Sequence, residues 1–188
     1  WWAVEIQSIA KAFLESYQQF HPNDAIQTFN VFNEDLPAFD GFTVQAKYSI
    51  MHGQEHSPEE RQAWKRIEAI IDTFKSADKY LISLPMWNFS IPYRLKQYID
   101  ILVQPGYTFS SGKEGYEGLV KNKPVTVVYA RGGAYPENSS AAALDMQKKY
   151  MELILGFIGF EKIHSIVAEP TLHGSRDDVE KILDGAFQ

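Results

Sequence analysis

Two stretches of sequence decide the fold: Tyr80-Leu81-Ile82-Ser83-Leu84, followed by Pro85-Met86-Trp87-Asn88-Phe89, and Pro124-Val125-Thr126-Val127-Val128-Tyr129, followed by Ala130-Arg131-Gly132-Gly133. Each apolar run is short and bounded by turn residues, which is typical of a strand buried on both faces of a parallel sheet. In an open α/β sheet, ligands bind in the crevice outside the carboxyl ends of the strands. The loops that follow the two strands therefore predict a single binding site.

Helical and strand patterns alternate on both sides of these runs. Apolar residues recur at helical spacing from Ile6 to Phe20, and a second helix over 58–76 begins with a capping box formed by Ser57 and Glu60. Further expected elements are a strand over 25–31, a surface loop over 40–56, a helix that ends near 105, a glycine-rich loop over 112–118, a helix over about 141–155, a strand over 162–168 and a final helix capped by Ser175.

This order predicts an α/β protein with a doubly wound parallel sheet and three layers, α/β/α, formed by residues 1–188 as a single domain. A sheet of strand order 2-1-3-4-5 needs a central strand before the first helix. Residues 1–6 are too few to form a strand, a loop and the start of a helix, so the expected first strand is missing from the sequence. Two explanations stay open: a strand precedes Trp1, or the protein departs from this fold at its middle strand.

The composition excludes several classes of protein. The 188 residues include no cysteine, which rules out disulfides, thiolate nucleophiles and cysteine zinc sites. A formal net charge of −6 without runs of Lys or Arg argues against a nucleic-acid partner. No apolar stretch approaches the roughly 18 residues that span a bilayer, and the chain does not open on a signal-peptide pattern. We therefore expect a cytoplasmic protein without a membrane partner.

One metal-binding pattern is present, His52-Gly53-Gln54-Glu55-His56. It resembles a zinc-peptidase motif, which needs a helix to place both imidazoles on one metal. Gly53 and the helix start at Ser57-Pro58 oppose such a helix, so a solvated loop is the favoured interpretation and no metal site is expected. His164 and His173 are isolated and are interpreted as structural or exposed.

The two loops after the strands carry groups suited to a large planar ligand. Met86 and Trp87 offer apolar area, Asn88 offers two hydrogen-bond donors and an acceptor, and the glycines at 132–133 let the backbone approach a ligand closely. Arg131 can carry charge or brace its loop. In the alternative interpretation, the aromatic residues belong to the core and the glycine pair is only a turn.

Taken together, these motifs closely resemble the FMN-dependent NADH-azoreductases, which are NAD(P)H:quinone oxidoreductases of flavodoxin-like fold. The matching segments run in the same order as in that family, between about Pro58 and His173. They are Leu84–Pro92, Leu95-Lys96, Gly106–Phe109, Glu117–Leu119, Ala130–Gly133 and Leu155–Gly159.

The resemblance implies which residues form the site. Those expected to hold the ring of FMN are Pro85, Met86, Trp87, Asn88 and Phe89 on one side, and Ala130, Arg131, Gly132, Gly133 and Tyr135 on the other. Many family members have Ser in place of Ala130 and His in place of Tyr135. The resemblance also places Phe109 and Phe157 at the substrate and implies a homodimer with sites at its interface. A second interpretation of Phe157 is a helix end that packs under the sheet.

The resemblance further implies a ping-pong reaction. NADH or NADPH delivers a hydride to FMN and leaves, and a quinone or azo compound then takes its place, so no catalytic side chain is expected. The alternative is a flavin-binding relative without turnover that serves electron transfer or protein interaction. Relatives bind the FMN phosphate with a serine-rich loop before the first helix, whereas residues 1–5 contain neither glycine nor a hydroxyl group.

Overall fold

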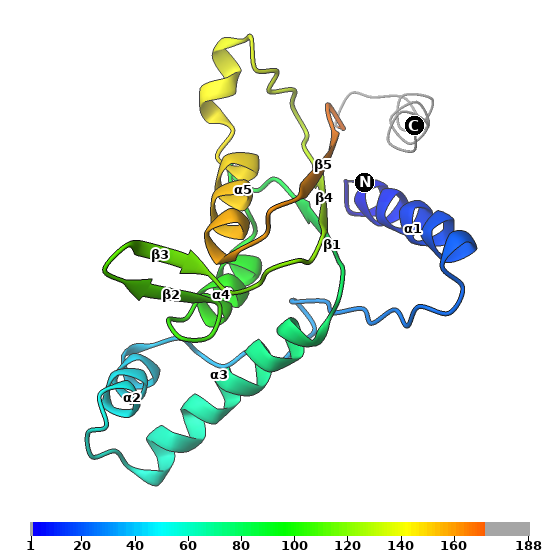
Figure 1. Cartoon of the computed structure of the whole chain (residues 1–188). Coiled ribbons are helices and arrows are strands. Elements are labelled where there is room, and N and C mark those ends of the chain that lie inside the picture. Colours follow the sequence, from blue (N-terminus) through cyan, green and yellow to red (C-terminus); the bar gives the residue numbers. More distant parts are fainter. Residues whose placement is uncertain (1, 172–188) are drawn as a thin grey trace.

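A computed structural model of the chain describes residues 2–171, with side chains from Ser8 onward. Figure 1 shows the elements in their order along the chain. The helices are α1 (Trp2–Phe20), α2 (Gly41–Met51), α3 (Pro58–Ser76), α4 (Tyr93–Leu102) and α5 (Gln147–Ile158), with a 3-10 helix η1 (Ser140–Leu144). The strands are β1 (Tyr80–Pro85), β2 (Phe109–Gly112), β3 (Gly115–Gly118), β4 (Val125–Ala130) and β5 (Ile163–Ala168).

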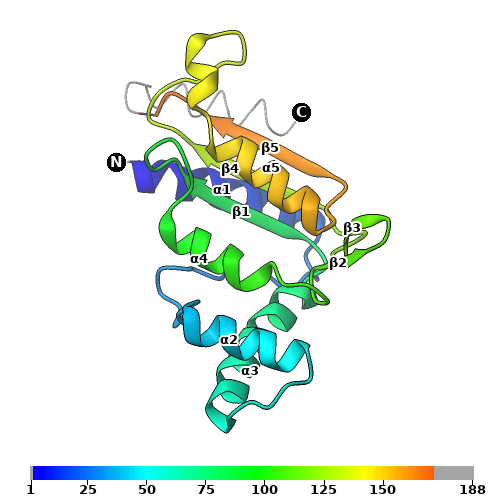
Figure 2. The same cartoon turned by 90° about the vertical axis from the view of Figure 1, so that its left-hand side faces the viewer.

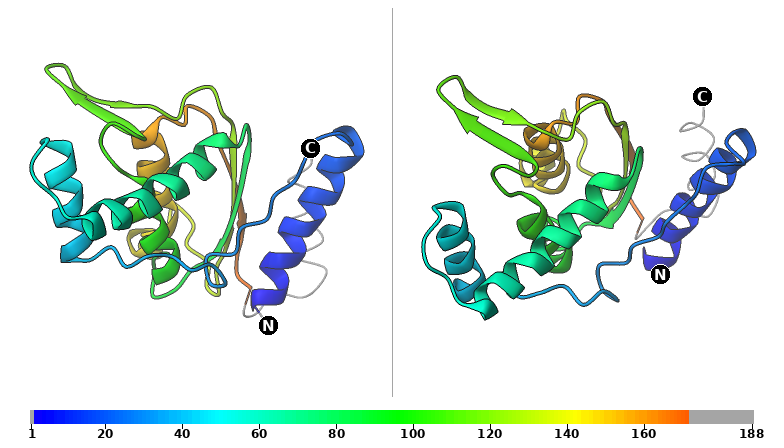
Figure 3. Two further views of the ribbon diagram at one scale, coloured as in Figure 1. Left: turned by 90° about the horizontal axis from the view of Figure 1, so that it is seen from below. Right: turned by 60° about the horizontal axis from the view of Figure 1, so that its bottom comes forward.

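A parallel sheet lies at the centre of the fold. Its strand order is β1-β4-β5, with Tyr80 opposite Val125 and Val125 opposite Ile163. Helix α1 packs on one face of the sheet, and α3, α4 and α5 lie on the other (Figure 3). The predicted three-layer α/β/α arrangement is confirmed, and the three strands end at one common edge.

The two faces of the sheet carry separate cores. The larger core lies on the side of α3, α4 and α5 and includes the fully buried Trp64, Ile67 and Ile71 of α3. On the other face, Ile9 of α1 packs with Val128 and other small residues of the sheet. Full burial of one such aliphatic side chain contributes about 1.5–3 kcal/mol to stability. These cores hold the strand ends at which the two loops begin.

The strand predicted over 25–31 is wrong, because residues 24–30 have no regular structure. A strand forms only beside another strand. Within the described residues, the segment does not pair with the outer edge of β1, which has β4 as its one neighbour in the sheet. The apolar residues of this segment pack on a helix instead: Phe29 stacks on Tyr98 with ring centroids 4.9 Å apart. Arg94 of α4 donates hydrogen bonds to the carbonyl oxygens of Val31 (3.0 Å) and Glu34 (2.6 Å).

The surface loop expected over 40–56 is also wrong in its first part, where α2 forms. Asp40 caps this helix by accepting a hydrogen bond from the backbone N–H of Thr43 at 3.0 Å. The residues that α2 buries are Thr43, Ala46 and Ser49, which are small or polar and leave no apolar period in the sequence. Helix α3, by contrast, begins with the predicted capping box at Ser57 and Glu60.

Two later elements differ from expectation. The glycine-rich segment over 112–118 was expected as a loop, but it belongs to the antiparallel hairpin β2–β3, in which Gly112 pairs with Gly115. The helix expected over 141–155 is divided into η1 and α5. The division falls at Asp145, whose Oδ1 accepts hydrogen bonds from the N–H groups of Gln147 (3.1 Å) and Lys148 (3.0 Å) and so starts a new helix.

The remaining elements agree with the sequence, while Ser175 and His173 lie outside the described residues. Helix α2 ends at Met51, so His52 and His56 do not share the face of one helix. Within residues 2–171, every helix is too short or too polar to cross a membrane.

Candidate functional site

The first loop leaves the sheet beside the end of β4. Pro85 pairs with Ala130 in the last position of the two strands, and the N–H of Met86 donates to the carbonyl oxygen of Ala130 at 2.8 Å. The side chain of Ala130 is buried and packs with Ile9 and Val128 toward α1. The two predicted loops therefore begin side by side, and Ala130 is part of the core rather than of an open surface.

A tight turn forms the tip of the first loop. Trp87 and Ser90 exchange backbone hydrogen bonds of 2.9 and 3.0 Å, with Asn88 and Phe89 between them. Both central residues have positive φ, 49° at Asn88 and 67° at Phe89, as a type I′ turn requires. Asn88 is exposed and the Phe89 side chain is 46% exposed. A phenylalanine held in the left-handed region is strained, and such strain is concentrated at functional sites.

The second loop meets the first through a pair of rings. The rings of Phe89 and Tyr135 lie edge to face, with centroids 6.4 Å apart and an interplanar angle of 85°. Gly133 is exposed, and a Cβ built there would lie 3.5 Å from the Tyr135 hydroxyl oxygen. The structure thus brings together the predicted residues of both loops, on the edge of the sheet where the sequence places them.

Arg131 takes the bracing role rather than an exposed one. Its side chain is 3% exposed and makes ion pairs with Asp145 (2.8 Å) and Glu169 (3.2 Å). Its backbone is also engaged, because its N–H donates to the carbonyl oxygen of Ala168 at 3.0 Å and its own carbonyl accepts from the N–H of Thr171 at 2.8 Å. The guanidinium group therefore faces the protein interior.

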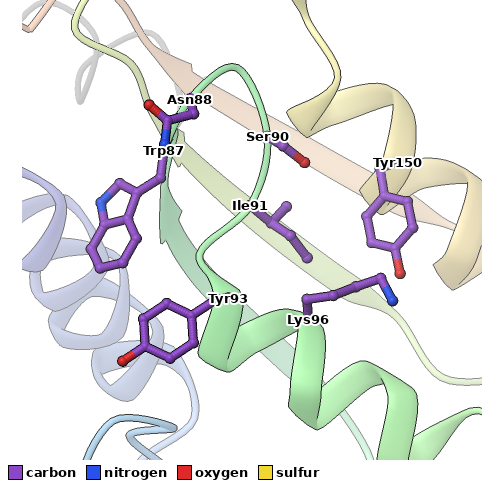
Figure 4. Close-up of a pocket in the computed structure, with 7 residues that line it drawn as sticks. All are labelled: Trp87, Asn88, Ser90, Ile91, Tyr93, Lys96 and Tyr150. Carbon is purple, nitrogen blue, oxygen red and sulfur yellow. The ribbon is translucent and has the colours of Figure 1, made fainter.

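A pocket of about 350 Å³ opens on the α4 and α5 side of the first loop. The residues that line it are Trp87, Asn88, Ser90, Ile91, Tyr93, Lys96 and Tyr150. Figure 4 shows the side chains of Lys96 and Tyr150 pointing toward one another across it. Burial, with a smaller contribution from Asp100, raises the pKa of Tyr150 to about 12, so its hydroxyl stays protonated at neutral pH.

Phe109 and Phe157 come together, but at the other end of the molecule. Their ring centroids are 4.8 Å apart, where the β2–β3 hairpin packs on the carboxyl end of α5. The amino end of α5 lies at the first loop, since the N–H of Met146 donates to the carbonyl oxygen of Phe89 at 3.0 Å. A helix rises 1.5 Å per residue, so Gln147 and Phe157 are about 15 Å apart along its axis. Figure 2 shows the hairpin at the opposite end of β1 from the loop that leads to α4.

Sequence reasoning missed several residues at the site. Asp145, Gln147 and Glu169 surround Arg131, and Phe32 packs on Trp87 with ring centroids 5.6 Å apart. A buried guanidinium requires partners, but the sequence alone does not show that Arg131 is buried. The sequence does not indicate which acidic residues these are, since they follow different elements.

The comparisons with known proteins agree with this arrangement. Residues 5–188 match the family described as Flavodoxin-like fold. An FMN-dependent NADH:quinone oxidoreductase of Nitratidesulfovibrio vulgaris (strain DP4) is 50% identical over 173 residues, which cover 92% of this chain and 83% of the relative. A protein of the same name from Desulfotalea psychrophila is 49% identical over 168 residues and covers 89% of this chain and 79% of its own length.

Solved structures give the same result. An FMN-dependent NADH-azoreductase from Bacillus anthracis str. Ames Ancestor, in complex with FMN, has a TM-score of 0.87 and 28% identity, covering 97% of this chain and 90% of that protein. The resemblance seen in the sequence is therefore confirmed. The chain belongs to the flavodoxin-like fold family and, within it, to the FMN-dependent NADH:quinone oxidoreductases.

Proposed function

We propose that this chain binds FMN between its two loops and uses NADH or NADPH to reduce quinones or azo compounds. The observation that carries the proposal is the strained, exposed turn at Asn88 and Phe89, which meets Tyr135 of the second loop. Its support from relatives is the 50% identity to an FMN-dependent NADH:quinone oxidoreductase.

The residues present fit the ring of FMN. A planar ring system needs apolar area for stacking and polar groups for its hydrogen-bonding edge. Trp87 and Phe89 supply the apolar area, while the side-chain amide of Asn88 makes no hydrogen bond within residues 8–171 and offers two donors and an acceptor. Family resemblance assigns the phosphate to a loop before the first helix, so the described residues bear only on the ring end of the site.

The chain contributes orientation and shielding to the reaction. When bound, FMN would accept a hydride from NADH or NADPH and pass the two electrons on to the quinone or azo compound. In our proposal, the Asn88 amide binds the polar edge of the ring and the open backbone at 132–133 lets the second loop approach it. The rings of Phe89 and Tyr135 cover one side against water, and the protonated Tyr150 hydroxyl is available as a hydrogen-bond donor in the pocket. Pro85 and Met86 fix the start of the loop on the sheet.

We also propose that the active form is a homodimer. Phe109 and Phe157 can serve as substrate-binding residues only if another subunit brings them to the loops, since within one chain they lie at the far end of α5. Exposed apolar side chains such as Tyr93 (68%) and Leu153 (70%) support a surface that a second subunit buries.

We also propose that residues 1–188 form a single domain and that the protein is cytoplasmic. The absence of cysteine fits a reducing compartment.

The test is the visible spectrum of the purified protein, recorded before and after anaerobic addition of NADH or NADPH. We expect an FMN spectrum that is bleached by at least one nucleotide and restored by a quinone or an azo dye. An FMN spectrum that neither nucleotide bleaches would favour the flavin-binding relative without turnover. A colourless protein that also rejects added FMN would refute both.

A further inference from the structure

A buried cluster beneath the two loops joins elements that are far apart in the sequence. The Arg131 cluster consists of Arg131 after β4, Asp145 and Gln147 at the start of α5, and Glu169 after β5. The guanidinium group of Arg131 pairs with both carboxylates, and its Nε donates to Oε1 of Gln147 at 3.1 Å. Arg131 is 3% exposed and Gln147 is 0% exposed, so these contacts are shielded from water.

The same cluster holds the loop that follows β1. Nε2 of Gln147 donates to the carbonyl oxygen of Leu84 at 3.3 Å, one residue before the loop begins. The adjacent Met146 donates its N–H to the carbonyl oxygen of Phe89 at 3.0 Å, at the end of that loop's tight turn. The first loop is therefore fixed to the start of α5 at both its ends.

The cluster also holds the second loop. Oε2 of Glu169 accepts a hydrogen bond from the N–H of Tyr135 at 3.1 Å while it pairs with Arg131 at 3.2 Å. Asp145 caps α5 with Oδ1 and pairs with Arg131 through Oδ2. Each of the three partners of Arg131 therefore makes a second contact besides the one with the guanidinium group.

We propose that the Arg131 cluster positions the two loops relative to each other, with Gln147 as the link between them. This inference rests on the proposed function, because the consequence considered is FMN binding between the loops. Its members are positioning residues: they act on the loop backbones at Leu84 and Tyr135 and through the start of α5. The planar guanidinium group can pair with several acceptors at once, which a lysine cannot do in the same geometry.

The physical reason is a population effect. A buried polar group that loses its partner carries a large desolvation penalty, so removing one link favours other loop arrangements in which the orphaned group finds water. The apparent dissociation constant rises in inverse proportion to the population that is competent to bind. If that population falls to about a tenth, FMN binds about tenfold more weakly.

The main variant is Gln147→Met, which keeps the volume of the side chain and removes both hydrogen bonds. Its matched control is Gln104→Met. Gln104 is 1% exposed and follows the carboxyl end of α4, which is remote from the loops. Its Nε2 donates to the carbonyl oxygen of Asp100 at 2.5 Å. We measure amide hydrogen exchange of 84–90 and 130–135 without added cofactor, and then the FMN dissociation constant and the visible circular dichroism of the bound flavin.

We expect Gln147→Met to raise exchange in both loops together and to weaken FMN binding about tenfold, with a changed flavin signal. Gln104→Met removes one hydrogen bond from an equally buried glutamine and should show neither change. If Gln147→Met does not fold, Asp145→Asn decides, because asparagine can keep the cap of α5 while removing the charge that pairs with Arg131.

Wild-type exchange in both loops together with a wild-type flavin signal, in whichever variant folds, would overturn the inference. If the wild-type protein binds no FMN, the proposed function fails, and exchange of the two loops still decides whether the cluster positions them.

Discussion

The ring of Phe89 meets the ring of Tyr135 edge to face, with centroids 6.4 Å apart. These residues follow different strands, β1 and β4, and this contact joins the tips of the two loops. Phe89 adopts a φ of 67°, which few residues with a Cβ tolerate. The backbone strain and the contact therefore occur in one residue, and a glycine at this position removes both.

Phe89→Gly should weaken FMN binding while leaving the fold intact. Relief of left-handed strain and the greater freedom of glycine in the unfolded chain oppose each other at about 1 kcal/mol each, so the free energy of unfolding should fall mainly by the lost ring contact with Tyr135, about 0.5–1.5 kcal/mol. Loss of an aromatic contact of about 0.5–1.5 kcal/mol with the FMN ring should raise the FMN dissociation constant about two- to tenfold. The control is Asn122→Gly, since Asn122 has a φ of 61° away from the loops. Equal FMN affinity in both variants would contradict the prediction.

Tyr135 is expected to act through its ring. The ring contacts Phe89, and the guanidinium carbon of Arg131 lies 5.9 Å from its centroid. Tyr135→Phe keeps both contacts and should bind FMN within about twofold of the wild-type value, whereas Tyr135→Ala should bind it about two- to tenfold more weakly. Fluorescence titration with FMN measures both constants. If Tyr135→Phe is as weak as Tyr135→Ala, the hydroxyl group and not the ring is responsible.

The position of the candidate site was largely predictable from sequence, because the two loops follow the ends of neighbouring strands. The apolar runs before Pro85 and Ala130 indicate two buried parallel strands, and parallel strands place their carboxyl ends at one edge of the sheet. Asn88, Phe89 and Gly133 are accordingly found together. The inward direction of the Arg131 side chain was not predictable, because its partners Asp145 and Glu169 belong to other elements.

The errors in the fold share a physical cause. Residues 25–31 alternate like a strand, but a strand needs a neighbour, and Phe29 and Val31 pack toward α4 instead. Helix α2 buries Thr43 and Ala46, which give no amphipathic pattern, and it is stabilised by packing against α3. In both cases tertiary contacts override the local sequence signal.

Gly118→Ala should destabilise the hairpin that carries Phe109. A Cβ at position 118 would lie 2.3 Å from the backbone nitrogen of Gly159, and backbone cannot move aside cheaply. Overpacking of this kind costs about 1–3 kcal/mol, which urea unfolding can measure. Gly112→Ala in the same hairpin is the control, because a Cβ there meets no atom within 4 Å. The prediction fails if the two variants unfold at the same urea concentration.

Stability should fall at alkaline pH in a way that depends on Tyr80. Burial, with a contribution from Asp78, raises the pKa of Tyr80 to about 12, against about 10 for an unfolded tyrosine. Between these pH values the unfolded chain releases the proton first, so this contribution to stability is complete below pH 10 and is lost as the pH rises toward 12.

Tyr80→Phe should therefore reduce the loss of unfolding free energy between about pH 10 and 12. It should also lower stability at pH 7 by about 1 kcal/mol, because the Tyr80 hydroxyl donates to the carbonyl oxygen of Phe74 at 2.7 Å. Tyr116→Phe removes a hydroxyl from a side chain that is 71% exposed and controls for that change. An unaltered pH dependence in Tyr80→Phe would exclude this assignment.

Mixing two inactive variants tests whether Phe157 acts across a subunit boundary. Phe157→Ala should impair quinone reduction without changing FMN affinity, since Phe157 lies at the far end of α5 from the loops. Asn88→Ala should impair the ring site instead. In a two-fold dimer that contains one copy of each variant, one site would combine the intact loop with the intact Phe157 of the partner subunit, and the other would carry both defects.

A 1:1 mixture that has exchanged subunits should thus recover about a quarter of the wild-type activity, because about half of the dimers are mixed and each has one restored site. The control is the same mixture assayed before subunits exchange, which should stay as inactive as its components. If Phe157 serves the loops of its own chain, a mixed dimer has no restored site and activity does not recover. Recovery therefore distinguishes a shared site from one that is complete within a single chain.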